Sequence, residues 1–186
     1  MAEPSGRALA VVDVSAVERN CRTLKERAGE GTELCAVVKA NGYGHGAATC
    51  AAAALRGGAT WLAVAAAKEA EELRLHFPDT PILVMGALTE DELRLALTAH
   101  AEIAVWREGF RELCSRVSAD LGRIARVHVK LDSGMGRLGT RAAASEILAA
   151  LAATSQNCGL GMACSEYTTS ALPASAALCT ALTAPE

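Results

Sequence analysis

A lysine followed four residues later by a tyrosine is the clearest chemical pattern in this sequence. Lys39 ends an apolar run, and Tyr43 lies in the segment that follows, among the glycines Gly42, Gly44 and Gly46. The neutral amine of a lysine attacks an aldehyde to form a Schiff base. Glycines let a backbone take positive φ and approach a ligand closely. An amine, a phenol and a turn open to anions are what an aldehyde carrying a phosphate requires, so we predict that this segment binds pyridoxal 5'-phosphate.

The elements on either side of Lys39 determine where its amine lies. Residues 34–38 form a short apolar run typical of a buried parallel strand. A helix is predicted to begin near Ala47, and its unpaired amides and positive dipole end would then lie near the same turn. An isolated K-x-x-x-Y spacing more often marks a lysine at a strand end followed by an ordinary turn. The complete string over residues 36–46 favours the cofactor.

The middle of the chain repeats one strand-plus-helix unit. Apolar runs begin about 20 to 26 residues apart, a length typical of a strand with its crossover helix. The predicted strands cover residues 34–38, 60–65, 81–85, 101–106 and 124–131. The sequence between them has helical periodicity, and Thr89 with Glu92 predicts a capping box at one helix start. A further strand over residues 9–12 is predicted to lead into the first helix.

This repeat indicates the fold class. Successive βα units without a G-x-G-x-x-G fingerprint favour a (β/α) barrel over a dinucleotide-binding sheet. We therefore predict an α/β protein built as a partial (β/α)8 barrel of the TIM type. It would contain about five βα units and an irregular C-terminal tail.

Two strings of the sequence resemble motifs of a known enzyme family. AVVKANGYGHGA over residues 36–47 is similar to the cofactor-attachment motif of alanine racemases, and HVKLDSGMGRLG over residues 128–139 is similar to a later motif of that family. The segments WLAVAAAKEAEELR and PILVMGALTE extend the resemblance over roughly residues 7–153. The resemblance implies an eight-stranded barrel followed by a β-rich domain. It also implies homodimers whose active sites are shared between subunits.

The resemblance also assigns roles to individual residues. Lys39 would carry the cofactor and act as the base for D-alanine, and Tyr43 would contact the cofactor phosphate. Arg137 would contact the phenolic oxygen of the cofactor. Lys130 corresponds to a lysine that is carbamylated in some members and positions that arginine. The implied reaction is the interconversion of L-alanine and D-alanine, which supplies D-alanine for peptidoglycan. The second base of the family is a tyrosine of the C-terminal domain, contributed by the partner subunit.

The strand before Arg137 shows a strict alternation of residue types. Arg126, His128, Lys130 and Asp132 point to one face and apolar residues to the other. On alternation alone, a functional site and an ordinary strand with a solvated face explain the pattern equally well. The resemblance to racemases favours the site.

Composition excludes several classes of function. The net charge is −3 and aromatic residues make up only 3%, so neither a basic surface nor stacking platforms for nucleic acid are expected. No apolar run approaches the ~20 residues of a membrane span, and the N-terminus lacks a secretory pattern. We therefore expect a cytoplasmic protein that acts on a small molecule. Seven cysteines without a CxxC pair and four scattered histidines predict neither a disulfide framework nor a metal site.

The composition changes after residue 154. Residues 155–186 contain only two charged residues, Glu166 and Glu186, yet three of the seven cysteines. We predict two parts: residues 1–154 as the N-terminal part of the cofactor-binding barrel, and residues 155–186 as an atypical tail that is disordered or arises from a shifted reading frame. The chain is then expected to be truncated and poorly active. The alternatives are a small pyridoxal-phosphate barrel of the homeostasis type and a non-catalytic remnant.

Overall fold

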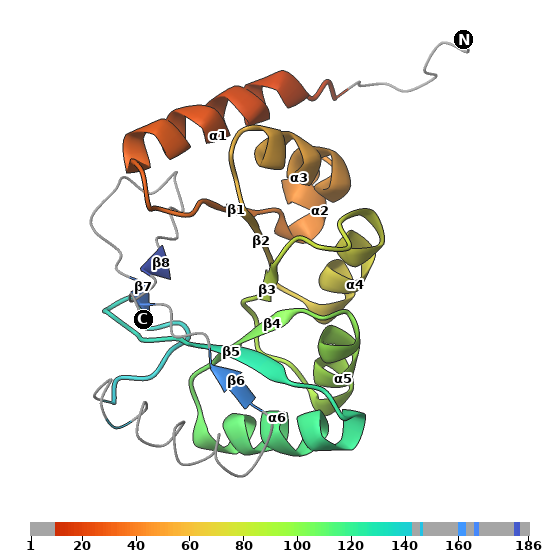
Figure 1. The fold of residues 1–186 in the computed structure, drawn as a ribbon, viewed down its shortest axis with the longest axis vertical. Helices are drawn as coiled ribbons and strands as arrows, with labels where there is room; N and C mark the ends of the chain where they lie inside the picture. The colour runs from red at the N-terminus through yellow and green to blue at the C-terminus, as the bar shows by residue number, and fades with distance from the viewer. Residues whose placement is uncertain (1–9, 143–145, 147–159, 163–165, 168–180, 183–186) are drawn as a thin grey trace.

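A six-stranded parallel sheet forms the centre of the molecule (Figure 1). The computed structural model describes residues 10–142, 146, 160–162, 166–167 and 181–182. The strands lie side by side in sequence order: β1 (Cys35–Val37), β2 (Trp61–Val64), β3 (Ile82–Val84), β4 (Glu102–Val105), β5 (Ala125–Val129) and β6 (Leu160–Met162). Two further short strands, β7 (Glu166–Tyr167) and β8 (Ala181–Leu182), pair in antiparallel fashion.

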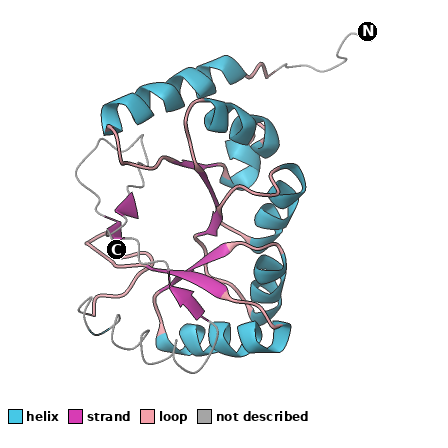
Figure 2. Ribbon diagram, in the orientation of Figure 1, coloured by secondary structure: helices cyan, strands magenta, loops and turns pink. Residues whose placement is uncertain are grey.

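Helices cover the outer, convex side of this curved sheet (Figure 2). They are α1 (Val14–Ala28), α3 (Ala47–Arg56), α4 (Ala67–His76), α5 (Glu90–Thr98) and α6 (Glu108–Leu121). The short element labelled α2 (Lys39–Tyr43) is a left-handed turn and not a regular helix. Sequential parallel strands with helices on one side form an arc of a (β/α) barrel, whereas a doubly wound sheet carries helices on both faces. The predicted barrel architecture is therefore present as a partial barrel.

The strands and helix starts agree closely with the predictions. Each of the five predicted strands is formed, shortened by a residue or two at its ends. The predicted helix begins at Ala47. At the start of α5, Thr89 Oγ1 accepts from Glu92 N at 3.4 Å and Glu92 Oε2 accepts from Thr89 N at 2.8 Å, which is the predicted capping box.

The strand predicted over residues 9–12 is wrong for the three of its residues that are described. Residues 10–12 have no strand conformation, and the Val11 side chain is 83% exposed. Apolar residues form a strand only where a neighbouring strand accepts its hydrogen bonds, and among the described residues none pairs with this segment. The segment instead leads to Asp13, whose Oδ1 accepts from Ala16 N at 3.1 Å and caps α1.

The predicted tail overlaps the described residues only in part. β6 lies within it and continues the sheet in parallel to β5, with Leu160 opposite Ala125. Apart from β6, β7 and β8, residues 155–186 lie outside the described residues. The division of the chain at residue 154 stays a prediction.

The core lies between the sheet and its outer helices. Fully buried strand residues such as Leu62 and Ile82 pack against helix residues such as Leu73 and Leu93. α3 contributes mainly alanines to this contact, which lets its backbone lie close to the strands. None of the helices in the described part of the chain is long and apolar enough to span a bilayer.

Replacement of a core leucine tests this packing. Leu62→Ala should lower the free energy of unfolding by about 2–5 kcal/mol, because the cavity lies between layers that cannot collapse freely. Leu75→Ala, on the outside of α4 and 81% exposed in the native protein, should change it by less than about 0.5 kcal/mol. Urea unfolding followed by far-UV circular dichroism measures both. Equal losses would show that β2 is not part of a packed core.

Candidate active site

Lys39 lies at the edge of the sheet where an active site is expected. It follows β1 at the carboxyl end of the parallel strands, the end at which (β/α) barrels place their active sites. Its side chain is half-buried, and its Nζ lies 5.9 Å from the centroid of the Tyr43 ring. The Tyr43 side chain is 58% exposed at this edge. The structure therefore brings together the amine and the phenol that the sequence singled out.

A left-handed turn carries the chain from Lys39 to Tyr43. Ala40 (φ 50°, ψ 48°), Asn41 (φ 52°, ψ 48°), Gly42 (φ 63°, ψ 38°) and Tyr43 (φ 56°) all have positive φ. Such a conformation costs roughly 1–2 kcal/mol for each residue with a side chain. Three of the four residues here have one, so surrounding contacts must hold the turn in place.

Hydrogen bonds to both neighbouring elements hold this turn. Gly42 N donates to Val38 O at 2.9 Å and so ties the turn to the end of β1. Asn41 accepts with its main-chain oxygen from Gly46 N and with its Oδ1 from Ala47 N, both at 2.9 Å. The first amide of α3 is therefore already paired. The expectation of unpaired amides at this helix start is therefore wrong for Ala47 N, which donates to Asn41.

Gly42 also allows the turn to pack against α3. A Cβ at this position would lie 3.2 Å from Ala47 N and 3.3 Å from Ala47 Cα, closer than nearly all real Cβ contacts. Glycine is thus favoured here, because its φ of 63° is strained for a residue with a side chain and because a Cβ would force Ala47 to shift.

The carboxylate of Glu69 connects the loops after β1 and β2. Its Oε1 accepts from Ala40 N at 2.5 Å, and its Oε2 accepts from Ala65 N at 2.9 Å and from Ala66 N at 3.0 Å. Glu69 was not among the residues that the sequence singled out. Its position three residues after the helix N-cap could have predicted the contact with Ala66, but the contact with Ala40 joins residues 29 apart and depends on the fold.

A second carboxylate organises the loop after β5. Asp132 Oδ1 accepts from Gly134 N at 3.1 Å and from Gly136 N at 2.9 Å, and Oδ2 accepts from Arg141 Nε at 2.9 Å. The side chain is only 7% exposed. The Gly136 amide, the Arg141 guanidinium and the Gly134 amide all favour the charged form and hold the pKa of Asp132 at about 2.

Lys130 and Arg137 lie at the same edge of the sheet as Lys39, beyond β5 instead of β1. Lys130 N donates to Val105 O at 2.8 Å, and Lys130 O accepts from Thr140 N at 2.9 Å, so its backbone extends the sheet. Arg137 is exposed in the loop that Asp132 closes. Within the described residues, no hydrogen bond or ion pair joins either cation to Lys39 or Tyr43. The roles implied for Lys130 and Arg137 stay predictions.

The alternating face of β5 divides into two parts. His128 is buried: its Nε2 lies 2.5 Å from Glu102 Oε2, and its ring meets Trp61 edge-on with centroids 5.6 Å apart. Arg126 is 70% exposed and approaches Glu102 Oε1 at 3.6 Å. Both side chains contact Glu102, the first residue of β4, whereas Lys130 and Asp132 follow the carboxyl end of β5 and are the residues of this face nearest the candidate site.

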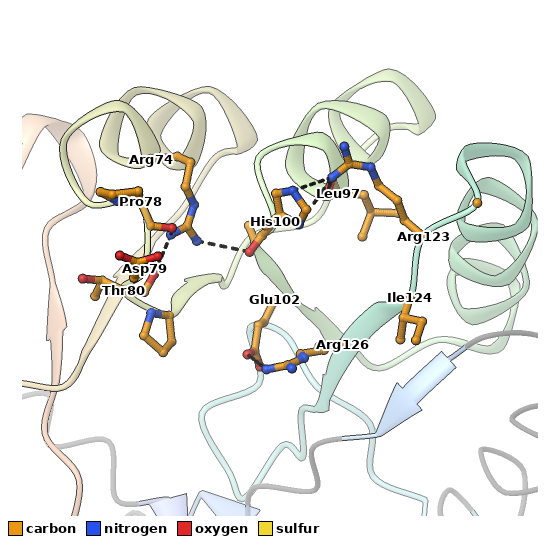
Figure 3. A pocket seen from close by; sticks show the side chains of 13 residues that line it. Arg74, Pro78, Asp79, Thr80, Leu97, His100, Glu102, Arg123, Ile124 and Arg126 are labelled. Carbon is orange, nitrogen blue, oxygen red and sulfur yellow. Dashed lines mark hydrogen bonds and ion pairs between the residues drawn. The ribbon is translucent and has the colours of Figure 1, made fainter.

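The opposite, amino edge of the strands carries a cavity of about 720 Å³ (Figure 3). Arg74 at this cavity donates to main-chain oxygens of neighbouring turns, including Phe77 O at 2.8 Å, Thr80 O at 2.8 Å and Ala99 O at 2.8 Å. Arg123 donates to Leu97 O at 3.3 Å. These arginines close helix-to-strand turns. Of the residues that the sequence singled out, Arg126 lines the cavity, whereas Lys39, Tyr43, Lys130 and Arg137 do not.

Comparisons with known proteins match most of this chain to one enzyme family. The family model described as alanine racemase, N-terminal domain, matches residues 12–171. The alanine racemase of Symbiobacterium thermophilum is 45% identical over 134 residues, which are 72% of this chain and 35% of that relative. The alanine racemase of Geobacillus kaustophilus is 42% identical over 130 residues, 70% of this chain and 34% of that relative. The chain thus spans about a third of the length of the curated relatives it matches.

Solved structures give the same result for the fold. The alanine racemase from Streptomyces coelicolor A3(2) superposes with a TM-score of 0.74 at 35% identity, covering 81% of this chain and 41% of that one. The alanine racemase from D-cycloserine producing Streptomyces lavendulae gives 0.75 at 34% identity, covering 82% and 40%. The predicted α/β barrel class is confirmed.

The low pKa of Asp132 predicts how stability depends on pH. Because the folded pKa of about 2 lies below the ordinary value of 3.8, the contribution of Asp132 is complete above about pH 4 and is lost as pH falls toward 2. Asp132→Asn should therefore be less stable than the native chain at pH 6, and the difference should shrink between pH 4 and pH 2. Urea unfolding across this range measures it.

Asp91→Asn, at an exposed position of α5, is the matched control and should show little difference from the native chain at any pH. A deficit in Asp132→Asn that stays constant from pH 6 to pH 2 would contradict the assigned cause.

Proposed function

The chain belongs to the alanine racemase family, and we propose that it binds pyridoxal 5'-phosphate through Lys39 for the interconversion of L-alanine and D-alanine. The position of the Lys39 amine carries this proposal. It is half-buried at the carboxyl edge of a parallel barrel sheet, 5.9 Å from the ring of Tyr43, on a backbone turn held from both sides. Such a turn limits the directions in which the amine can point.

The chemistry of the donor set fits the cofactor. Lys39 offers an amine to an aldehyde, and the Tyr43 hydroxyl at the same turn can donate to a phosphate oxygen. Lys130 and Arg137 add two cations at the same edge, suited to anionic oxygens. When bound, pyridoxal phosphate supplies an electron sink that makes the α-proton of an amino acid easier to remove.

The residues of the chain would then divide the work. Lys39 Nζ would remove the α-proton of D-alanine from one face, or deliver a proton to that same face when L-alanine is the substrate, and Tyr43 would orient the cofactor through its phosphate. The Asp132 loop would hold Arg137 at the same edge of the sheet, beyond β5, and Lys130 would position it there. Racemisation also needs an acid–base group on the other face. We propose that a second subunit of a homodimer contributes it, as the family resemblance implies, and that the enzyme acts in the cytoplasm.

Covalent trapping tests the anchor. Incubation with pyridoxal phosphate followed by borohydride should label Lys39, as read by peptide mass spectrometry, and Lys39→Arg should remove the label because a guanidinium does not form the linkage. Lys68→Arg, at an ion-paired surface position of α4, is the control and should leave the label in place. Absence of label on Lys39 in the native chain would refute the proposal.

A coupled assay for D-alanine separates the reaction from binding alone. Formation of D-alanine from L-alanine that depends on Lys39 supports the racemase. Labelled Lys39 without any racemisation would show cofactor binding without the reaction, as expected for a small barrel of the homeostasis type or for a racemase part without its second acid–base group. A chain that neither binds nor turns over would be a non-catalytic remnant.

The role of Tyr43 is tested by comparing two ligands. Tyr43→Phe should weaken binding of pyridoxal phosphate by about ten-fold, the effect of losing one hydrogen bond to a charged group. It should leave binding of pyridoxal, which lacks the phosphate, within about two-fold of the native value. Absorbance titrations with both ligands give the dissociation constants. Equal weakening for both would place Tyr43 away from the phosphate.

A further inference from the structure

We propose that Glu69 is a positioning residue for Lys39, a role that rests on the proposed function of Lys39. Its carboxylate is divided between two tasks. Oε2 accepts from Ala65 N and Ala66 N at the start of α4, which is ordinary capping. Oε1 accepts from Ala40 N, the residue directly after Lys39. The second contact contributes nothing to capping of α4, so its effect falls on the turn that carries the amine.

The turn needs such a contact because of its conformation. Ala40 is the first of its left-handed residues, and a residue with a side chain enters this conformation at a cost. The Ala40 amide has no strand to donate to, since β1 ends at Val37. A charged acceptor at 2.5 Å stabilises the amide in the orientation that the left-handed turn imposes. Because Ala40 directly follows Lys39, holding the Ala40 amide in place also limits the direction of the Cα–Cβ bond of Lys39.

The loop after β2, to which Glu69 is also bonded, is itself closely packed. The other two partners of Glu69, Ala65 and Ala66, follow β2, and Ala65 packs closely on the next loop. A Cβ at Gly86, after β3, would lie 2.1 Å from Ala65 O, so the two backbones are in direct contact. The loops after β1, β2 and β3 thus form one continuous support. Lys39 is held through Glu69 against two neighbouring βα units.

Glu69→Gln separates the two tasks. A glutamine side chain has only one accepting oxygen, so it can replace only one of the two carboxylate oxygens of Glu69. Its NH2 group, placed where the other oxygen was, would face a main-chain N–H and could not accept from it. The oxygen is expected to stay with the two donors of Ala65 and Ala66, which leaves Ala40 N facing the amide group. The variant should keep the cap of α4 and release the turn. Glu92→Gln is the matched control, because Glu92 caps α5 in the same position through Thr89 alone.

The readouts are the reactivity of Lys39 and hydrogen exchange of its turn, measured on the full chain with urea unfolding as a check on folding. Glu69→Gln should raise the pyridoxal phosphate concentration needed for half-maximal borohydride-trapped label on Lys39 by about ten-fold. It should also accelerate deuterium uptake in a peptide spanning residues 38–46. Glu92→Gln should change both by less than about two-fold, while its urea midpoint shifts as much as that of Glu69→Gln or more.

Each outcome decides one of the two proposals. Native-like labelling and exchange in Glu69→Gln would overturn the role of Glu69 while leaving the function of Lys39 intact. Equal losses in Glu69→Gln and Glu92→Gln would also overturn it, because capping alone would then explain the effect. If the native chain shows no label on Lys39, the proposed function fails, and the exchange comparison still shows whether Glu69 holds the turn.

Discussion

The left-handed turn after β1 is the constraint on which the candidate site depends. Ala40, Asn41 and Tyr43 adopt a backbone conformation that is unfavourable for residues with side chains. Hydrogen bonds within the turn, such as the one from Gly44 N to Ala40 O at 3.0 Å, offset part of this cost, and neighbouring elements contribute further contacts. Glu69 holds its first residue, and Asn41 ties its second to the start of α3. The core that orders β1 to β5 thereby also determines the direction of the Lys39 side chain.

The two edges of the sheet leave opposite kinds of backbone group without partners in the helices. At the carboxyl edge helices begin, and their first amides lack partners, so carboxylates and amide oxygens are the useful side chains there. Glu69, Asp132 and Asn41 accept from main-chain amides at this edge. At the amino edge helices end and carbonyl oxygens lack partners, so guanidinium groups serve instead. Arg74 and Arg123 donate to such oxygens. The arginines at the cavity on that edge are therefore explained by the turns that they close.

Patterns local to the sequence predicted much of this. Apolar runs gave the five strands because a parallel strand buried on both faces needs them, and the Lys39 and Tyr43 pair was recognised from spacing. Contacts between distant residues were not predictable. Glu102 lies in an apolar strand, and only the alignment of β4 with β5 brings it to His128. The same holds for Glu69 and Ala40. Residues 9–12 had the right composition for a strand but no partner strand among the described residues.

The distribution of charge at the carboxyl edge follows from these contacts. Asp132 and Glu69 place two negative charges there, but each is satisfied by amide donors, and Asp132 also by Arg141. Among the described residues, no ion pair involves Lys39, Lys130 or Arg137. The loop-building carboxylates therefore do not neutralise the three cations at this edge. Cations at such an edge are suited to anionic oxygens, while hydrogen bonds to the carboxylates hold the loops themselves. The acidic residues that build the site and the basic residues that would bind the ligand thus act independently.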